Sequence, residues 1–476
     1  MTSPFYILPS RLRVSFLVVL LSVAGASSAQ TLSLDSARSL ALEHNRSLAS
    51  ARLQTQQYEH TMKSLRANFF PNFKVQANDF WATCDGTFSI AGGYLPTFSY
   101  SAATGTMVPN VLTDATGNPV MNGSTPVFKE YAYFPGADID YKIGNVIQVG
   151  LTVEQPLYMG GKVSAGYRMG QLGYRMSQLN EQLSVSQTLV DVTEAYTLLV
   201  QAQEMNKVAL DYDTLLSRLL RDVESAKRHG MVSKNEVLKV QVKKNEAELQ
   251  VRRADNAVKL AQMNLAQKLG LPLTDKILAD PQSLSLHEEV SMGDISSRPE
   301  YRILDYQTQL AVQKVKLARA DFLPQVGVAA GYSYVNGVEL NNSKFLDGAD
   351  FGVLVNVKVP LFHFGEGYHK VKAARLEADR TRLSQLDLDE QMNLELRQAW
   401  NNLDEARLEA QMTETALEQA AENLRSSRRS YDVGLESLSD LLEAQTLWQQ
   451  AYARNVQARC NWSLQSIRYD KAAGLM

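Results

Sequence analysis

The chain repeats itself at a fixed distance of 204 residues, and this duplication limits its fold more than any other feature. "EQPLYMGG" at 154–161 matches "KVPLFHFG" at 358–365, and "HGMVSKNEVLKVQ" at 229–241 matches "VGLESLSDLLEAQ" at 433–445. A third pair, "QKLGL" at 267–271 and "KAAGL" at 471–475, has the same offset. Several matches at one offset indicate an internal duplication, so both halves should adopt the same order of elements.

A second pair of motifs shows how each half is built. "RANFFPNF" at 66–73 and "RADFLPQV" at 319–326 each end a helical pattern at a proline, which lacks the N–H that a helix needs. The first half carries 49 extra residues, all between Pro71 and Pro156. We therefore predict a first structural repeat at 30–271, a non-helical linker at 272–297 and a second structural repeat at 298–476.

After each proline the hydrophobic period changes to two, which is typical of β-strands. Apolar residues alternate with small or polar ones at 325–334 and 350–359, and again at 73–77 and 147–153. Runs of about ten residues suit tilted membrane strands, although a water-soluble sheet with one wet face gives the same pattern. In a membrane, Val353, Val355 and Val357 would face lipid. The extra residues predict a long loop at 82–146.

The helical segments favour an extended assembly. Residues 163–228 read as one helix of about 100 Å, and apolar residues at 3-4 spacing from Ala195 to Ala226 indicate a coiled-coil seam. Beyond the N-terminal segment, no apolar run reaches the ~18 residues of a membrane helix. Four strands cannot close a barrel, and open sheet edges are not tolerated in hydrocarbon. A membrane sheet would therefore require several chains to pool their strands.

The N-terminal segment 1–29 is typical of a signal peptide. Arg11 and Arg13 precede a short apolar core, and "SSA" supplies small residues at a cleavage site. The net charge of −3 gives no reason to expect nucleic acid. Cys84 and Cys460 form no metal-type spacing. We expect no enzyme, no cofactor and no metal site.

These motifs together resemble the outer membrane efflux (TolC-like) family. The residues that carry the resemblance are "LSLDSARSLALEHN", "RANFFPNF", "SRPEYRI", "QPLYMGG", "VPLFHFG" and "YDVGLESLSDLLEAQ". The family implies a homotrimer with a barrel of about twelve strands in the outer membrane of a Gram-negative bacterium, embedded in its lipid, and a coiled-coil α-helical barrel in the periplasm. Such a channel passively conducts substrates from an inner-membrane pump, which it meets through a periplasmic adaptor.

The alternative is a non-conducting periplasmic coiled-coil adaptor or tether. An adaptor would flank a single helical hairpin with β-domains, whereas this chain places paired strands between helices twice. Strand position therefore favours the channel.

The resemblance also implies functional residues at the two helical turns. Asp440 and Glu443 would form an acidic ring at the periplasmic gate, and some of these carboxyls should titrate above their free values. Tyr431 and Glu236 match a gate network, whose basic partner is replaced here by Glu436, with Lys234 as the candidate substitute. The turns around Gly230, Ser233, Gly434 and Ser437 would dock on the adaptor. The other interpretation of Asp440 and Glu443 is a pair of ordinary solvated acids.

Overall fold

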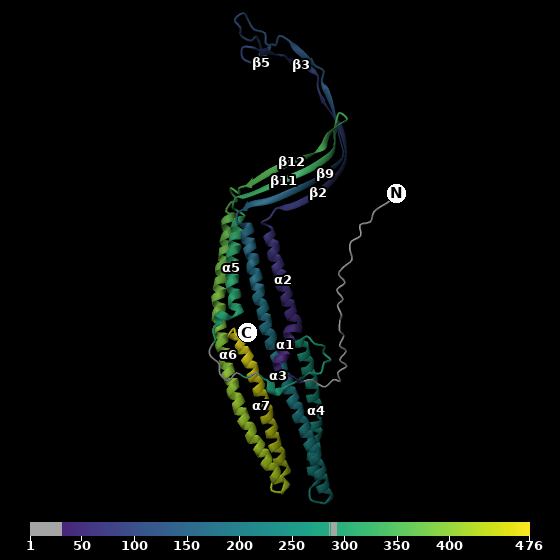
Figure 1. The fold of residues 1–476 in the computed structure, drawn as a ribbon, viewed down its shortest axis with the longest axis vertical. Coiled ribbons are helices and arrows are strands. Elements are labelled where there is room, and N and C mark those ends of the chain that lie inside the picture. Colours follow the sequence, from purple (N-terminus) through teal and green to yellow (C-terminus); the bar gives the residue numbers. More distant parts are fainter. Residues whose placement is uncertain (1–30, 285, 287–292) are drawn as a thin grey trace, which may run out of the picture. The chain divides into compact units, whose positions relative to one another are not determined.

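The computed structural model describes residues 31–284, 286 and 293–476, so the predicted signal peptide lies outside the described part. The chain divides into two compact units (Figure 1). The helical unit takes the described parts of Met1–Gln56, Met176–Asp305 and Ser384–Met476, and the strand unit takes Gln57–Arg175 and Tyr306–Leu383. Each structural repeat therefore contributes to both units.

A four-stranded antiparallel sheet, in the order β12-β11-β9-β2, forms the centre of the strand unit (Figure 1). One hairpin comes from each repeat, so β2 and β12 are the edges of the sheet. The strands are β2 (Asn72–Ile90), β9 (Ala137–Met159), β11 (Gln325–Leu340) and β12 (Ser343–Lys358). At 16 to 23 residues they are longer than the ten expected from the alternating pattern.

The pairing register separates the two faces of this sheet. One row across all four strands is apolar, and the next row, on the opposite face, is small or polar, because successive side chains point to opposite faces. The rows are Val353–Ala330–Val153–Phe73 and Gly352–Gly331–Thr152–Lys74. On the polar face Lys74 Nζ lies 2.6 Å from Glu154 Oε2. The predicted alternation of faces is thus confirmed.

The loop that connects β2 to β9 is shorter than the predicted loop at 82–146. Residues of the expected loop 82–146 continue both strands, because Cys84 pairs with Ile143 and Ile90 pairs with Ala137. A register shift between Trp81 and Cys84 interrupts the alternating pattern at the point where the loop was expected to begin. The connection holds six short strands: β3 (Gly93–Pro96), β4 (Phe98–Ser101), β5 (Thr106–Pro109), β6 (Met121–Asn122), β7 (Thr125–Pro126) and β8 (Tyr131–Phe134).

Three helices of the first repeat, α2, α3 and α4, recur in the second with nearly equal lengths, whereas α1 has no equivalent there. The first repeat supplies α1 (Leu34–His44), α2 (Arg46–Ala67), α3 (Lys162–Arg228) and α4 (Lys234–Leu269), and the second supplies α5 (Pro299–Ala320), α6 (Glu366–Asp432) and α7 (Leu438–Ala472). Both α3 and α6 have 67 residues, and α3 confirms the helix predicted at 163–228. No helix in the described part of the chain is long and apolar enough to cross a membrane.

The start of the described chain and the linker both form hydrogen bonds with α3. Strand β1 (Thr31–Leu32) pairs in parallel with β10 (Leu278–Ala279), and the described part of the linker also contains two 3₁₀ turns, η1 (Pro281–Ser283) and η2 (Ile295–Ser297). That described part contains no α-helix.

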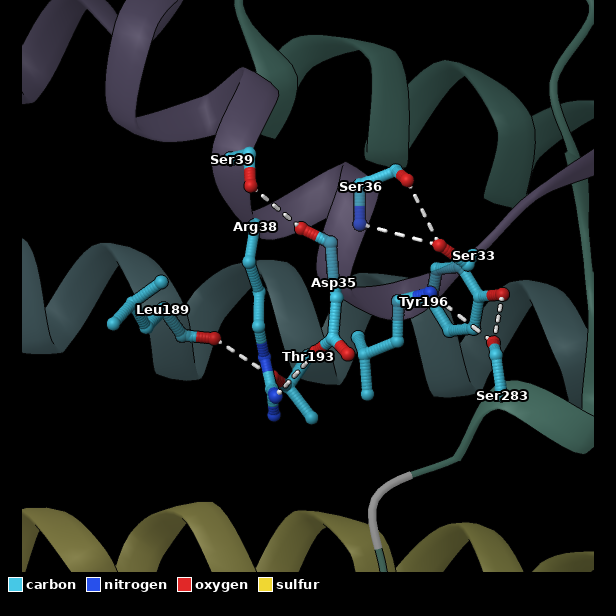
Figure 2. Close-up of polar contacts among 10 residues, drawn as sticks. Ser33, Asp35, Ser36, Arg38, Ser39, Leu189, Thr193, Tyr196 and Ser283 are labelled. Carbon is cyan, nitrogen blue, oxygen red and sulfur yellow. Dashed lines mark hydrogen bonds and ion pairs between the residues drawn. The ribbon is translucent and has the colours of Figure 1, made fainter.

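Tyr196 of α3 is the centre of this attachment (Figure 2). Its side chain is fully buried, and its Oη lies 2.7 Å from the Leu32 carbonyl and 2.8 Å from Ser283 Oγ while accepting from the Asp280 amide at 2.8 Å. Burial raises the pKa of the Tyr196 phenol. Arg38 of α1 adds a second contact with α3, because its Nη2 donates to Thr193 Oγ1 at 3.2 Å (Figure 2). These contacts replace water for groups that burial would otherwise leave unpaired.

Candidate functional site

Two turns in the helical unit have the same backbone geometry. Helix α3 ends with Gly230 at φ +74°. The Gly230 amide donates to the Lys227 carbonyl and the Met231 amide donates to the Ala226 carbonyl, both at 2.9 Å. Helix α6 ends in the same way with Gly434 at φ +77°. Its amide donates to the Tyr431 carbonyl at 3.0 Å and the Leu435 amide donates to the Ser430 carbonyl at 2.8 Å. Both are Schellman caps, in which glycine takes the left-handed conformation without a Cβ clash.

A serine then begins the returning helix in each hairpin. Ser233 and Ser437 have nearly equal backbone angles, φ −77° and −79° with ψ 159°, and their hydroxyls accept from the amides of Glu236 and Asp440. Each satisfies a backbone donor that the first helical turn leaves free. The predicted hairpin residues are therefore the caps of both turns.

Asp440 completes a capping box at the start of α7. Its Oδ2 accepts from the Ser437 amide at 3.0 Å and from the Ser437 hydroxyl at 2.7 Å. These hydrogen bonds favour the charged carboxylate and lower the pKa of Asp440, with the hydroxyl contributing most. Within one chain this direction is opposite to the one expected for a crowded acidic ring. Glu443, one turn later, has an exposed side chain.

A buried apolar cluster joins the two hairpins. Leu438 of α7 packs with residues of α3 and α4, and Tyr431 and Leu442 lie partly buried against the same group. The α3 and α4 members are Tyr212, Leu216, Leu219, Val223, Val237, Val240 and Ala247. Several of them belong to the predicted seam from Ala195 to Ala226, but Leu198 of that seam is exposed. The seam is therefore a packed interface near the turns and is interrupted further along α3.

The predicted gate network is only partly assembled in one chain. Burial raises the pKa of Tyr431, and the nearby negative charge of Glu236 adds to this effect. Among the contacts of the described residues, no hydrogen bond joins Tyr431 to Glu236, and no ion pair involves Lys234. Glu436 has a different partner, because the buried Ser427 hydroxyl donates to its carboxylate. This bond braces the α6–α7 turn where the resemblance had suggested a basic residue.

The sequence shows apolar residues in both turns, and in the structure two of them are largely exposed. Met231 and Leu435 occupy equivalent positions directly after the two glycines, and they are 72% and 81% exposed. Val433 beside them is also exposed. In a Schellman cap the apolar residue after the glycine commonly packs back on its own helix, so exposure at this position was not expected from the cap. Here these side chains remain available to another surface.

The family model for outer membrane efflux proteins matches residues 135–271 and 295–475. Among curated proteins, the chain is 26% identical to Protein CyaE of Bordetella pertussis over 356 residues, which cover 68% of this chain and 70% of that protein. It is 24% identical over 311 residues to the alkaline protease secretion protein AprF of Pseudomonas aeruginosa, covering 62% of this chain and 63% of that protein.

Solved structures share the fold along nearly the whole chain. The CmeC outer membrane channel of Campylobacter jejuni has a TM-score of 0.70 at 18% identity, covering 99% of this chain and 94% of that one. The open state of the MtrE outer membrane channel of Neisseria gonorrhoeae has a TM-score of 0.69 at 17% identity, covering 94% and 93%. Because the family model matches most of the chain, with segments in both repeats, this chain belongs to the outer membrane efflux protein family.

Proposed function

We propose that three copies of the chain form an outer membrane channel that passively conducts substrates delivered by an inner-membrane pump. One observation carries the proposal: the four-stranded sheet has an apolar face, a polar face and two unpaired edges. Open edges are not tolerated in lipid, so the sheet must continue into other copies. Twelve strands leave a lumen, whereas about eight are filled by side chains. We infer no catalytic role, since the family consists of efflux proteins.

Mass measurement in detergent and planar-bilayer recording test this proposal together. We expect a trimer, recovered from the outer membrane fraction, that conducts ions when added to a bilayer. A stable monomer, or a freely soluble periplasmic product, would contradict the channel and support the adaptor or tether.

We also propose that the two hairpin turns dock on a periplasmic adaptor. Met231 and Leu435 support this, since exposed apolar side chains beside small polar residues suit contact between helices. AprF is an alkaline protease secretion protein, whereas CmeC and MtrE are outer membrane channels. A shared docking surface would serve export of either kind of cargo.

Cysteine crosslinking tests the docking surface. Ser233 and Ser437 are poor positions for cysteine because both cap helices. Asn235 and Ser439 are exposed and equivalent in the two hairpins, so Asn235→Cys and Ser439→Cys, in a Cys84→Ser background, should capture the adaptor. Asn342→Cys, in the exposed turn between β11 and β12, is the matched control and should not. Capture only by the control position would show that the orientation is inverted.

The same turns would form the periplasmic gate. In a trimer, Asp440 and Glu443 would each occur three times around a narrow mouth and would favour cations. The buried cluster around Leu438 and Tyr431 would hold the mouth closed against that repulsion. Glu236 would add its charge beside Tyr431. Tyr431→Phe, which keeps the ring but removes the hydroxyl, should raise the open probability in planar-bilayer recordings. An unchanged open probability would assign closure to the buried cluster alone.

A further inference from the structure

The duplication places Gly160 and Phe364 at equivalent positions, where each strand hairpin leads into a long helix. Their φ angles are +63° and +46°, and the residues that follow, Gly161 and Gly365, both have φ +86°. The two turns thus share an unusual left-handed backbone. A bulky residue there is rare, because its Cβ crowds the backbone. Phe364 therefore occupies a position where its equivalent in the first repeat is glycine.

The surroundings of the two turns differ sharply. Gly160 is buried, and a β-carbon added there would lie 2.5 Å from the Ala320 carbonyl oxygen and 2.9 Å from Leu323 Cβ. The proline stop of the second repeat covers this turn. Phe364, in contrast, is 92% exposed. It stacks edge-on against the exposed Phe362, with ring centroids 4.8 Å apart, and Leu361 beside them is exposed as well.

The first proline stop is the equivalent of the segment that covers Gly160, but it covers no turn within the chain. Ala67 and Phe70 in the first proline stop are equivalent to Ala320 and Leu323 in the second. Ala320 is fully buried, whereas Ala67 is exposed and Phe70 is 60% exposed. The exposed turn at Phe364 follows the end of β12, and the exposed first proline stop precedes the start of β2. These two strands are the opposite edges of the same sheet.

Strand lengths indicate the same missing partner. Strand β9 continues through Pro156 to Met159 because Gln325 and Val326 of β11 pair with Met159 and Tyr158. In the second repeat, β12 stops at Lys358, and residues 359–363 belong to no strand. By the duplication β12 corresponds to β9, so its missing partner corresponds to β11. That partner would be the start of a β2 strand, and the outer edge of β2 is unpaired in this chain.

The charges of the two junctions have changed together. At the covered junction Lys162 Nζ lies 3.0 Å from Asp321 Oδ1. The equivalent residues are Glu366 and Asn68. A glutamate opposite an aspartate would be repelled, but an asparagine amide can donate to the carboxylate. Glu366 and Asn68 therefore remain complementary to each other although neither matches its counterpart.

We propose that the proline stop Ala67–Phe73 of a second copy of this chain covers the turn at Leu361–Gly365, with Phe364 as its apolar anchor. Strand β2 of the second copy extends the pairing of residues 359–363, and its Asn68 donates to Glu366. Because the Gly160 junction has no space for a side chain, the phenyl ring lies beside Phe70 of the second copy rather than beneath the stop. The inference rests on the proposed channel only for the number of copies in the assembly. The contact itself is argued from the two junctions.

Paired cysteines test this contact directly. In a Cys84→Ser background, a short bismaleimide crosslinker should join the double variant Asn68→Cys, Glu366→Cys between chains, seen as dimers and trimers on denaturing gels. The matched control Lys162→Cys, Asp321→Cys occupies the equivalent junction within one chain, where the two side chains meet, so the same reagent should link it without joining chains. A trimer by mass whose 68–366 pair stays uncrosslinked would overturn the inference and leave the channel intact. A monomer by mass would overturn both.

A second variant keeps the test independent of cysteine geometry. Phe364→Gly should be tolerated by the fold, because it makes the turn identical to Gly160 and removes a strained backbone. We expect it to lower the temperature at which the oligomer dissociates in detergent while leaving the circular dichroism of the chain unchanged. Tyr100→Ala removes an aromatic side chain that is also exposed but lies in β4, outside the four-stranded sheet, and it should leave dissociation unchanged. Equal dissociation of Phe364→Gly and the parent protein would overturn the anchor.

Discussion

The amide and hydroxyl of Ser437 both donate to Oδ2 of Asp440, at 3.0 and 2.7 Å. This makes Asp440 part of the cap of α7, whereas Glu443 on the same helix is exposed. The two acids proposed for the gate are therefore different in kind. A change at Asp440 alters a charge and a helix end together, while a change at Glu443 alters the charge.

The first prediction concerns ion selectivity. Glu443→Gln should weaken cation preference and block by divalent cations, because it removes one carboxylate per chain from the proposed mouth. Reversal potentials in planar bilayers measure this. Asp440→Asn should have the same sense but should also disturb the turn. If neither variant alters selectivity or block, both acids are ordinary solvated residues.

The second prediction concerns the cap of α7. Ser437→Ala should destabilise the first turn of α7 by about 1 kcal/mol, since it leaves a backbone donor without its acceptor. Hydrogen exchange of the Asp440 and Leu441 amides measures the loss. Ser439→Ala is the control, because Ser439 is exposed and is not the cap. Equal protection in the two variants would contradict the capping role.

The third prediction adds the pH dependence of that cap. The pKa of Asp440 is lowered from 3.8, so the cap is fully stabilising above that pH and is lost as the pH falls through the lowered value. The protection factors of the amides at the start of α7, which are corrected for the intrinsic pH dependence of exchange, should therefore fall only below about pH 3.8. Ser437→Ala should remove most of this dependence, because Ser437 supplies the hydrogen bonds that lower the pKa.

The fourth prediction concerns the faces of the sheet. Val355 lies opposite Val328, whereas the neighbouring Asn356 lies opposite Gly327 on the other face. If the apolar face meets lipid, Val355→Arg should cost about 2–4 kcal/mol near the bilayer midplane and Asn356→Arg much less. Recovery of folded oligomer from membranes compares them. Equal tolerance of both changes would show that the apolar face is not in lipid.

The fifth prediction concerns the helical core. Leu216 is fully buried in the cluster between the hairpins, so Leu216→Ala should destabilise the protein by about 2–5 kcal/mol. Leu198 belongs to the same predicted seam but is exposed, so Leu198→Ala should change stability by no more than about 0.5 kcal/mol. Thermal unfolding in detergent separates the two. A large loss at Leu198 would place it in a contact between copies.

Much of the site could be located from the sequence, because helix ends obey local rules. Proline at 71 and 324, glycine at 230 and 434, and serine at 233 and 437 stop or start helices where the structure has them. Each acts through its own backbone or through an amide a few residues away. The duplication was equally visible, and the family match confirms the channel interpretation over the adaptor.

The sequence by itself thus determined the order of elements, the helix ends and the alternating faces of the strands. Tertiary structure alone decided that β2 and β9 extend into the predicted loop, that Leu198 is exposed and that Phe364 lacks the cover that Gly160 has. A strand continues as far as another strand pairs with it, and a side chain is buried only where a distant segment covers it. Periodicity records the faces of an element but carries no information about which remote segment will lie against them.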